Sequence, residues 1–454
     1  MPAISMRIAM LAIFTFITLY AIPDAAFATE PPTAEQEPSI EELEADAQKA
    51  YREKNWVKLY STNMKLHKRR PHAPEYMMEI VRAAAAIDRR RTAYHFMLMM
   101  QQQGLSYDMD AMEETEGMRG AEAYEYINKI MIEAGQPAGE GELHVELPVR
   151  PGDLGDVAWD ETRKRFLVGT RSEGKLLSVA DDGSIELLLQ ADEENGLWSI
   201  EGLAVDAKSN ALWIASSATP DFAGFSPADA YRAGLYRFEL DSLQPAGRYN
   251  LAADGLPHSL GSIAVADDGT VYVIDRAVPM VYHKPADSEK LEHFIALPGF
   301  VALTDISVTP DRSRLFVSDA VMGILLVDPR SGASALLKGP ETLNQYGIYG
   351  VDYVPGALVI TQSGISPQRL MRLELDTAGA AVETITPMAI ALEGFDWPGV
   401  GTLRGDSLYY FANQGTQSGD ERARMMVTPL DAGGEITQPD MRVFEESMEQ
   451  KGQQ

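Results

Sequence analysis

The sequence predicts an all-β, six-bladed β-propeller preceded by a smaller all-α domain of helical repeats. Six segments in the C-terminal two thirds repeat one pattern: an apolar strand, a turn rich in Asp, Pro, Gly, Ser or Asn, and a second apolar strand with a polar last residue. These polar residues follow one another at intervals of 46, 59, 44, 43 and 51 residues, which is the spacing of four-stranded blades. The preceding segment has helical periodicity instead.

Residues 1–28 have the pattern of an export signal peptide. Arg7 precedes an apolar run over residues 8–22, and Ala26-Phe27-Ala28 supplies the small residues of a cleavage site. The run is shorter than the ~20 residues that span a bilayer. We therefore expect cleavage after Ala28, no membrane span in the mature chain, and a periplasmic or secreted protein. The alternative is an uncleaved membrane anchor.

The composition limits the partners. The chain has a formal net charge of −28, and a surface this acidic repels nucleic acid and anionic membranes, so neither is expected to bind. It contains no cysteine, so stability must come from packing rather than disulfides. Two local basic clusters, at residues 67–70 and 89–91, fit solvated helix ends, with an anionic-partner site as the alternative.

A Pro- and Glu-rich linker at 29–38 is followed by a predicted helical domain at 39–137. Ser39 and Glu42 have the spacing of a capping box, which indicates a helix start. Segments 56–64 and 92–100 align at an offset of 36 residues, so the helix pairs resemble tetratricopeptide repeats. Further helices are expected to start at Asn55-Trp56 and Ala73-Pro74, to run over 92–103, ended by Gly104, and to run over about 121–134, ended by Gly135.

The propeller is expected to occupy residues 142–445. A propeller must close its ring, because an open blade would expose unpaired backbone groups. The strand-like segment 143–149 has no partner before the first repeat, so we expect it to pair with 424–429 in the last blade. The alternative closing strand is 441–445. Residues 446–454 are predicted to be a disordered tail.

Candidate functional residues gather at the predicted axial mouth, where innermost strands start and second strands end. Glu201, Asp156 and Asp305 lie at strand starts, and carboxylate oxygens from separate blades suit Ca²⁺. His258, just before the third blade, is the candidate general base, with an ordinary loop histidine as the alternative. In each of the six repeats, the last residue of the second strand is polar. These residues either form a ligand-binding rim or satisfy the next turn; they are Thr170, Ser216, Asp275, Asp319, Gln362 and Asn413.

The segments IEGLAVD, GSIAVADDGTVYVID and DISVTPDRSRLFVSD resemble the senescence-marker-protein/gluconolactonase-like propellers, and the likeness covers residues 142–445. This resemblance implies a calcium-dependent hydrolase of the lactonase or esterase type, acting on a small molecule at the mouth. Catalytic members place a Glu before the Gly of one blade, as Glu201 does here. The equivalent corners elsewhere are Gly155, Gly261, Thr304, Tyr349 and Gly399.

Two functions therefore remain open. One is a metal-assisted hydrolase in which Glu201, Asp156 and Asp305 hold the cation and His258 transfers protons. The other is a non-catalytic envelope protein that binds a small molecule or a protein partner. The helical domain favours this function, and so does the lack of good metal ligands at the corners equivalent to Glu201. The chain lacks a Gly-x-Ser-x-Gly elbow, a His-Glu-x-x-His motif and a phosphate loop, so serine hydrolase, zinc protease and nucleotide enzyme activities lose support.

Overall fold

The computed structural model describes residues 37–252, 254–415 and 422–434. The predicted signal peptide at 1–28, most of the predicted linker, the alternative closing strand at 441–445 and the predicted tail at 446–454 lie outside the described residues.

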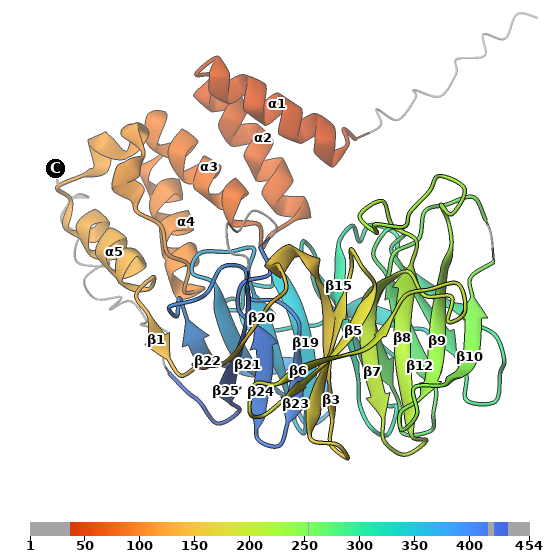
Figure 1. The fold of residues 1–454 in the computed structure, drawn as a ribbon. Helices are drawn as coiled ribbons and strands as arrows, with labels where there is room; N and C mark the ends of the chain where they lie inside the picture. Colours follow the sequence, from red (N-terminus) through yellow and green to blue (C-terminus); the bar gives the residue numbers. More distant parts are fainter. Residues whose placement is uncertain (1–36, 253, 416–421, 435–454) are drawn as a thin grey trace, which may run out of the picture.

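Six antiparallel sheets follow a helical region, so the predicted six-bladed propeller is confirmed (Figure 1). From the innermost strand outward, the blades are β3 (Leu154–Asp160), β4 (Arg165–Thr170), β5 (Lys175–Ala180) and β6 (Ile185–Gln190); β7 (Ser199–Asp206), β8 (Ala211–Ser217), β9 (Ala233–Glu239) and β10 (Pro245–Asn250); β11 (Leu260–Val265), β12 (Val271–Asp275), β13 (Met280–Lys284) and β14 (Glu292–Ala296); β15 (Leu303–Val308), β16 (Leu315–Asp319), β17 (Gly323–Val327) and β18 (Ser334–Leu336); β19 (Ile348–Val354), β20 (Ala357–Gln362), β21 (Arg369–Leu375) and β22 (Val382–Ile390), extended by β1 (Ala138–Gly139); and β23 (Gly401–Arg404), β24 (Ser407–Phe411), β25 (Ala423–Pro429) and β2 (Glu142–Leu147).

The ring closes as predicted, because β2 pairs antiparallel with β25 in the sixth blade. Arg404 of that blade then reaches the first blade, where its guanidinium lies 4.1 Å from the centre of the Trp159 ring and pairs with Asp181. A cation over an aromatic face adds attraction to the ion pair. The chain ends of the propeller are therefore joined both by backbone pairing and by side chains.

The helical region consists of α1 (Ile40–Arg52), α2 (Trp56–Arg69), α3 (Pro74–Ala86), α4 (Arg90–Gln102), two short 3₁₀ helices (Met109–Ala111 and Glu113–Met118) and α5 (Glu122–Glu133). The predicted capping box is confirmed, since Ser39 and Glu42 bond each other's backbone N–H. The fourth helix begins two residues earlier than expected, and the 3₁₀ helices were not expected. The tetratricopeptide assignment stays a prediction. Among the described residues, no helix has the length and hydropathy needed to cross a membrane.

The helical region lies against the propeller (Figure 1), and buried polar contacts fix it to the fifth blade. Arg369, which is 2% exposed, donates to the backbone carbonyls of Gln103 and Gly104 at the end of α4. Asn344, in the connection into this blade, donates to the His72 carbonyl at 2.9 Å and to the Gln103 side chain at 2.8 Å. Arg369 opens β21 at the edge where β20 ends, which is the mouth face. The helices therefore stand on that face.

Glycines allow the innermost strands to approach one another around the axis. A Cβ on Gly202 would lie 1.9 Å from the backbone oxygen of Gly261 in the next blade, and one on Gly155 would lie 1.9 Å from that of Ile200. No side chain fits at such a separation without moving backbone. The glycines at these corners are therefore required by packing.

We predict that Gly202→Ala lowers the free energy of unfolding by about 1–3 kcal/mol, because the added methyl group must displace a neighbouring strand. Gly117→Ala is the matched control, since a Cβ there meets no atom within 4 Å. Urea unfolding of both variants measures the difference. Equal stability of the two variants would contradict the close packing described here.

Candidate functional site

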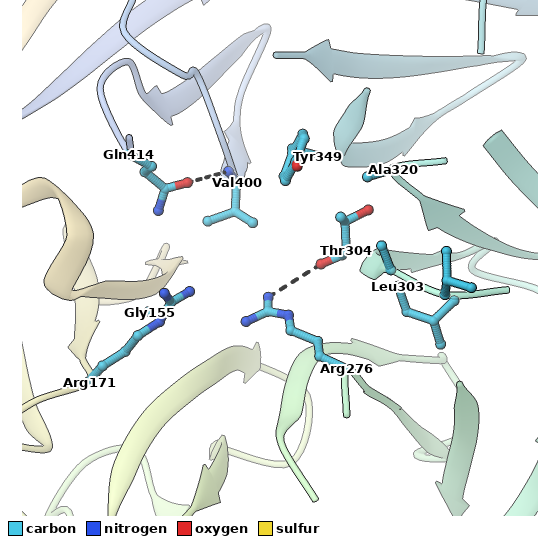
Figure 2. Close-up of a pocket in the computed structure, with 11 residues that line it drawn as sticks. Gly155, Arg171, Arg276, Leu303, Thr304, Ala320, Tyr349, Val400 and Gln414 are labelled. Atoms are coloured by element: carbon cyan, nitrogen blue, oxygen red, sulfur yellow. Dashed lines mark hydrogen bonds between the residues drawn. The ribbon is translucent and has the colours of Figure 1, made fainter. Parts of the chain in front are cut away.

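Two cavities lie along the propeller axis. The mouth cavity, of about 350 Å³, is lined from several blades by residues that include Arg171, Arg276, Thr304, Tyr349 and Gln414 (Figure 2). The axial cavity, of about 400 Å³, is lined by all six innermost strands and contains the three carboxyl groups of Asp156, Asp305 and Asp352. The mouth therefore presents guanidinium groups, whereas the axis presents carboxyl groups.

Bulges in the innermost strands separate these two levels. The pairing of β7 with β8 shifts register at Glu201, and the corresponding pairs of the fourth and fifth blades shift at Thr304 and Tyr349. A bulge adds one residue and changes the direction of its side chain. Thr304 and Tyr349 line the mouth, whereas Asp305, the next residue after Thr304, lines the axial cavity. The one-residue offset among the predicted metal ligands therefore places them at different depths.

Glu201 is held by two arginines. Its Oε2 lies 3.2 Å from Nη1 of Arg276 and 3.4 Å from Nε of Arg171, and its Oε1 accepts a 2.9 Å hydrogen bond from the Ser199 hydroxyl. The residue is only 5% exposed. Both carboxylate oxygens of Glu201 are therefore already engaged by protein groups, which does not fit the predicted role of calcium ligand.

Asp156 and Asp305 join neighbouring blades through backbone hydrogen bonds. Asp156 Oδ2 accepts from the N–H of Leu203 at 2.9 Å. Asp305 Oδ2 accepts from the N–H of Val351 at 2.7 Å, and its Oδ1 accepts from the hydroxyl of Ser262. Within the described residues, no three His, Asp or Glu side chains form a group suited to a metal ion. The three predicted calcium ligands therefore do not converge on one point: Glu201 is ion-paired, whereas Asp156 and Asp305 accept hydrogen bonds between blades.

The acids of the axial cavity bind protons more tightly than usual. Burial raises the pKa of Asp156 to about 7, with a further contribution from the nearby Asp305 charge. Burial also raises the pKa of Asp305. For Asp352, burial followed by repulsion from Asp305 and Asp156 raises the pKa well above the ordinary value. These groups therefore carry less negative charge near neutral pH than three exposed aspartates would.

The predicted rim residues hold turns and are absent from the lining of the mouth cavity. Asp275, Asp319, Gln362 and Asn413 are each 0% exposed. Asp319, for example, accepts from the N–H groups of Val301, Ala302, Val321 and Met322. The second interpretation left open by the sequence, a side chain that satisfies the adjoining turn, describes these residues, and Thr170 and Ser216 act in the same way.

Residues that line the mouth cavity lie one position further along the chain. Arg171, Arg276, Ala320 and Gln414 follow directly after four of the predicted residues, and all four line the mouth cavity. Successive side chains of a strand point to opposite faces, so a shift of one position exchanges buried for exposed. The sequence carries a signal for these residues, since an arginine follows the second strand in two blades.

His258 does not reach the mouth cavity. Its Nδ1 lies 2.6 Å from Oδ2 of Asp275 and its Nε2 lies 3.1 Å from Oδ1 of Asp254, and the residue is 6% exposed. Both ring nitrogens are therefore engaged by carboxylates. This arrangement fixes the loop before β11 and leaves no nitrogen to act as the predicted general base on a ligand in the mouth.

We predict that the contribution of these axial carboxyls to stability falls as pH rises from about 4 through about 7, because buried carboxyls with raised pKa values bind protons in the folded chain that the unfolded chain has already released. Asp352→Asn removes one such group. The unfolding free energy of the variant minus that of the parent chain is expected to be larger at pH 8 than at pH 5 by on the order of 1 kcal/mol.

Urea unfolding at both pH values tests this expectation, with Asp287→Asn, on an exposed turn, as the control. If Asp352→Asn changes the pH dependence no more than the control does, the burial of these acids described above is wrong.

No protein-family model matches the chain, and no curated protein matches it. Solved structures do resemble it: a luciferin-regenerating enzyme (12% identity, TM-score 0.47, covering 66% of this chain and 98% of that one), a gluconolactonase from Xanthomonas campestris (16%, 0.42, 62% and 86%), and the PQQ-bound aldose sugar dehydrogenase from Streptomyces coelicolor (16%, 0.42, 64% and 100%). At such low identities and scores these likenesses carry no conclusion about activity, and the six-bladed fold rests on the strands themselves.

Proposed function

We propose that the mouth cavity binds a small anionic molecule that carries a carboxylate or phosphate group. The observation that supports this most directly is Arg171. Its Nε faces Glu201, and its two terminal nitrogens have no partner among the described residues, although the side chain lines the cavity. A guanidinium presents a fork of donors that matches a carboxylate or phosphate. Arg171 therefore offers an open anion-binding group.

The surroundings strengthen this positive site. Arg276 lies beside the same cavity, and its Nη2 donates to the Thr304 carbonyl at 3.3 Å, which fixes the guanidinium (Figure 2). Glu201 neutralises one of the two arginine charges. The raised pKa values of the three aspartates in the axial cavity reduce the negative charge near the site. A cavity of about 350 Å³ lies at the small end of ligand pockets, which favours a metabolite-sized ligand.

Two neutral side chains add possible contacts. Gln414 accepts from the Val400 N–H at 3.0 Å through Oε1, so its amide nitrogen remains a donor. Burial raises the pKa of Tyr349, followed by the effect of the Asp319 charge, which keeps its hydroxyl protonated and able to donate. Arg171, Arg276, Tyr349 and Gln414 therefore all supply hydrogen-bond donors at the mouth, as recognition of an anion requires.

The calcium-dependent lactonase or esterase implied by the family resemblance has weaker support. The oxygens of Glu201, Asp156 and Asp305 already accept hydrogen bonds or ion pairs, and no step is assigned to a cation held by them. Binding without catalysis agrees better with these contacts. With the export signal expected at residues 1–28, such binding would take place in the periplasm or outside the cell.

We predict that the chain binds inorganic phosphate or succinate, and that Arg171→Gln and Arg276→Gln each weaken this binding about tenfold or more, because a charge-assisted hydrogen bond contributes roughly 1.5–3 kcal/mol. Isothermal titration calorimetry measures the affinities. Arg330→Gln is the matched control, since Arg330 lies exposed on a turn of the fourth blade. Failure of both probes to bind, or equal losses in all three variants, contradicts the proposal.

Calcium separates the two functions. The anion site described here predicts the same phosphate or succinate affinity with added calcium and with a chelator. A calcium-dependent hydrolase predicts instead a heat of calcium binding to the chelator-treated protein that Glu201→Gln abolishes. Thermal unfolding of each variant shows whether the fold is retained, so that a lost affinity is assigned to the site and not to unfolding.

A further inference from the structure

The mouth cavity has an apolar side that the anion site proposed above does not use. Four of its lining residues belong to the fourth blade and the connection into it; they are Val301, Ala302, Leu303 and Ala320. The innermost strands contact one another in ring order, so the fourth blade stands across the axis from the first, which supplies Arg171. Figure 2 shows Leu303 and Ala320 on the opposite side of the cavity from Arg171. The cavity is therefore charged on one side and apolar on the other.

Buried hydrogen bonds fix the backbone of this apolar side. Oδ2 of Asp319 accepts from the N–H groups of Val301 and Ala302 at 2.9 and 2.8 Å. The Ala302 carbonyl accepts from the Ala320 N–H at 2.9 Å, and the Ala320 carbonyl accepts from the Gly347 N–H at 2.7 Å. A ligand would therefore meet a preformed surface, so binding would not require the protein to become ordered.

Tyr349 adds an aromatic ring beside these residues. Its centre lies 5.3 Å from that of the Trp397 ring, in an edge-to-face arrangement. The Trp397 backbone N–H donates to Oε1 of Gln368 at 3.0 Å, and its carbonyl accepts from the Gln414 N–H at 3.0 Å. Trp397 stays in place although its φ of +70° is a conformation that large side chains rarely adopt. Such strain persists where the surroundings hold it, often beside ligand sites. Trp397 therefore positions the Tyr349 ring at the cavity.

Part of the apolar side is open to solvent. Val301 is 51% exposed, and Tyr349 is half-buried. Moving apolar surface out of water into contact with another apolar group is favourable in proportion to the area covered. An inorganic anion bonded to Arg171 would leave this surface in water, whereas an apolar group on the anion would cover it. The cavity therefore favours an organic anion over phosphate.

We propose that the ligand of the mouth cavity is a carboxylate that carries a flat apolar ring, an inference that rests on the anion site proposed above. The carboxylate would bond Arg171 and Arg276, which are the charged residues of the lining. The ring would lie on Ala320 and against the Tyr349 ring, because aromatic rings pack favourably in offset or edge-to-face contact. A charged group at this end of the ligand would lose its water against apolar side chains, which is costly.

The test titrates the full chain with 3-phenylpropionate and with propionate, which differ only by the ring, in isothermal titration calorimetry. We expect 3-phenylpropionate to bind at least about tenfold more tightly, because the ring and the apolar side cover each other. Val301→Ser and Tyr349→Ala should each lower this ratio of affinities several-fold. Val57→Ser is the matched control, since it makes the same substitution at a valine of α2 that is 64% exposed, and it should leave the ratio unchanged.

Equal affinities for the two carboxylates would overturn this inference. If phosphate nevertheless binds with its dependence on Arg171, the anion site stands and only the apolar group is wrong; if neither phosphate nor the carboxylates bind, both proposals fail. A ratio that Val301→Ser and Tyr349→Ala leave unchanged, or that Val57→Ser lowers equally, would place the ring elsewhere on the protein and also overturn the inference. Thermal unfolding of the three variants shows whether each remains folded, and the exposed Val301 permits the test even if Tyr349→Ala unfolds.

Discussion

The innermost strands of the six blades approach one another so closely that backbone groups of one blade meet side chains of the next. Gly155 and Gly202 permit this approach, and Asp156 and Asp305 secure it by accepting N–H groups across the blade boundary. Carboxylates used in this way are satisfied by donors within the propeller. The packing of the ring therefore uses the carboxylates of Asp156 and Asp305 to join neighbouring blades, which makes them less available to bind a ligand.

That constraint also explains the charge at the mouth. The bulges bring Glu201, Thr304 and Tyr349 to the mouth end of the innermost strands, and Glu201 is then paired with Arg171 and Arg276. A buried carboxylate without such partners would be costly, because charges removed from water need compensation. Two cations for one anion leave a positive surplus, which is why binding of an anion follows more directly from this geometry than binding of calcium.

The fold was predictable because repeats and periodicity are properties of whole segments. Six strand-turn-strand units, the capping box at Ser39 and the unpaired segment before the first unit together predicted the blades, the first helix and the ring closure. The site was not predictable to the same degree, because it depends on single-residue offsets. A bulge or a strand end turns Asp275 into the fold and Arg276 into the mouth, and nothing in the composition of the turn distinguishes these two outcomes. The contacts of His258 were not predictable for a related reason, since they depend on where Asp254 and Asp275 place their carboxylates around its ring nitrogens.

A crystal structure of the mature chain grown with phosphate would test the central claim most directly, because it locates the anion and the arginines in one map. The account predicts density for a tetrahedral anion within hydrogen-bonding distance of Arg171 and Arg276, with Glu201 still paired to both. A mouth without an anion, together with a cation coordinated by Glu201, Asp156 and Asp305 in crystals that also contain calcium, would contradict it.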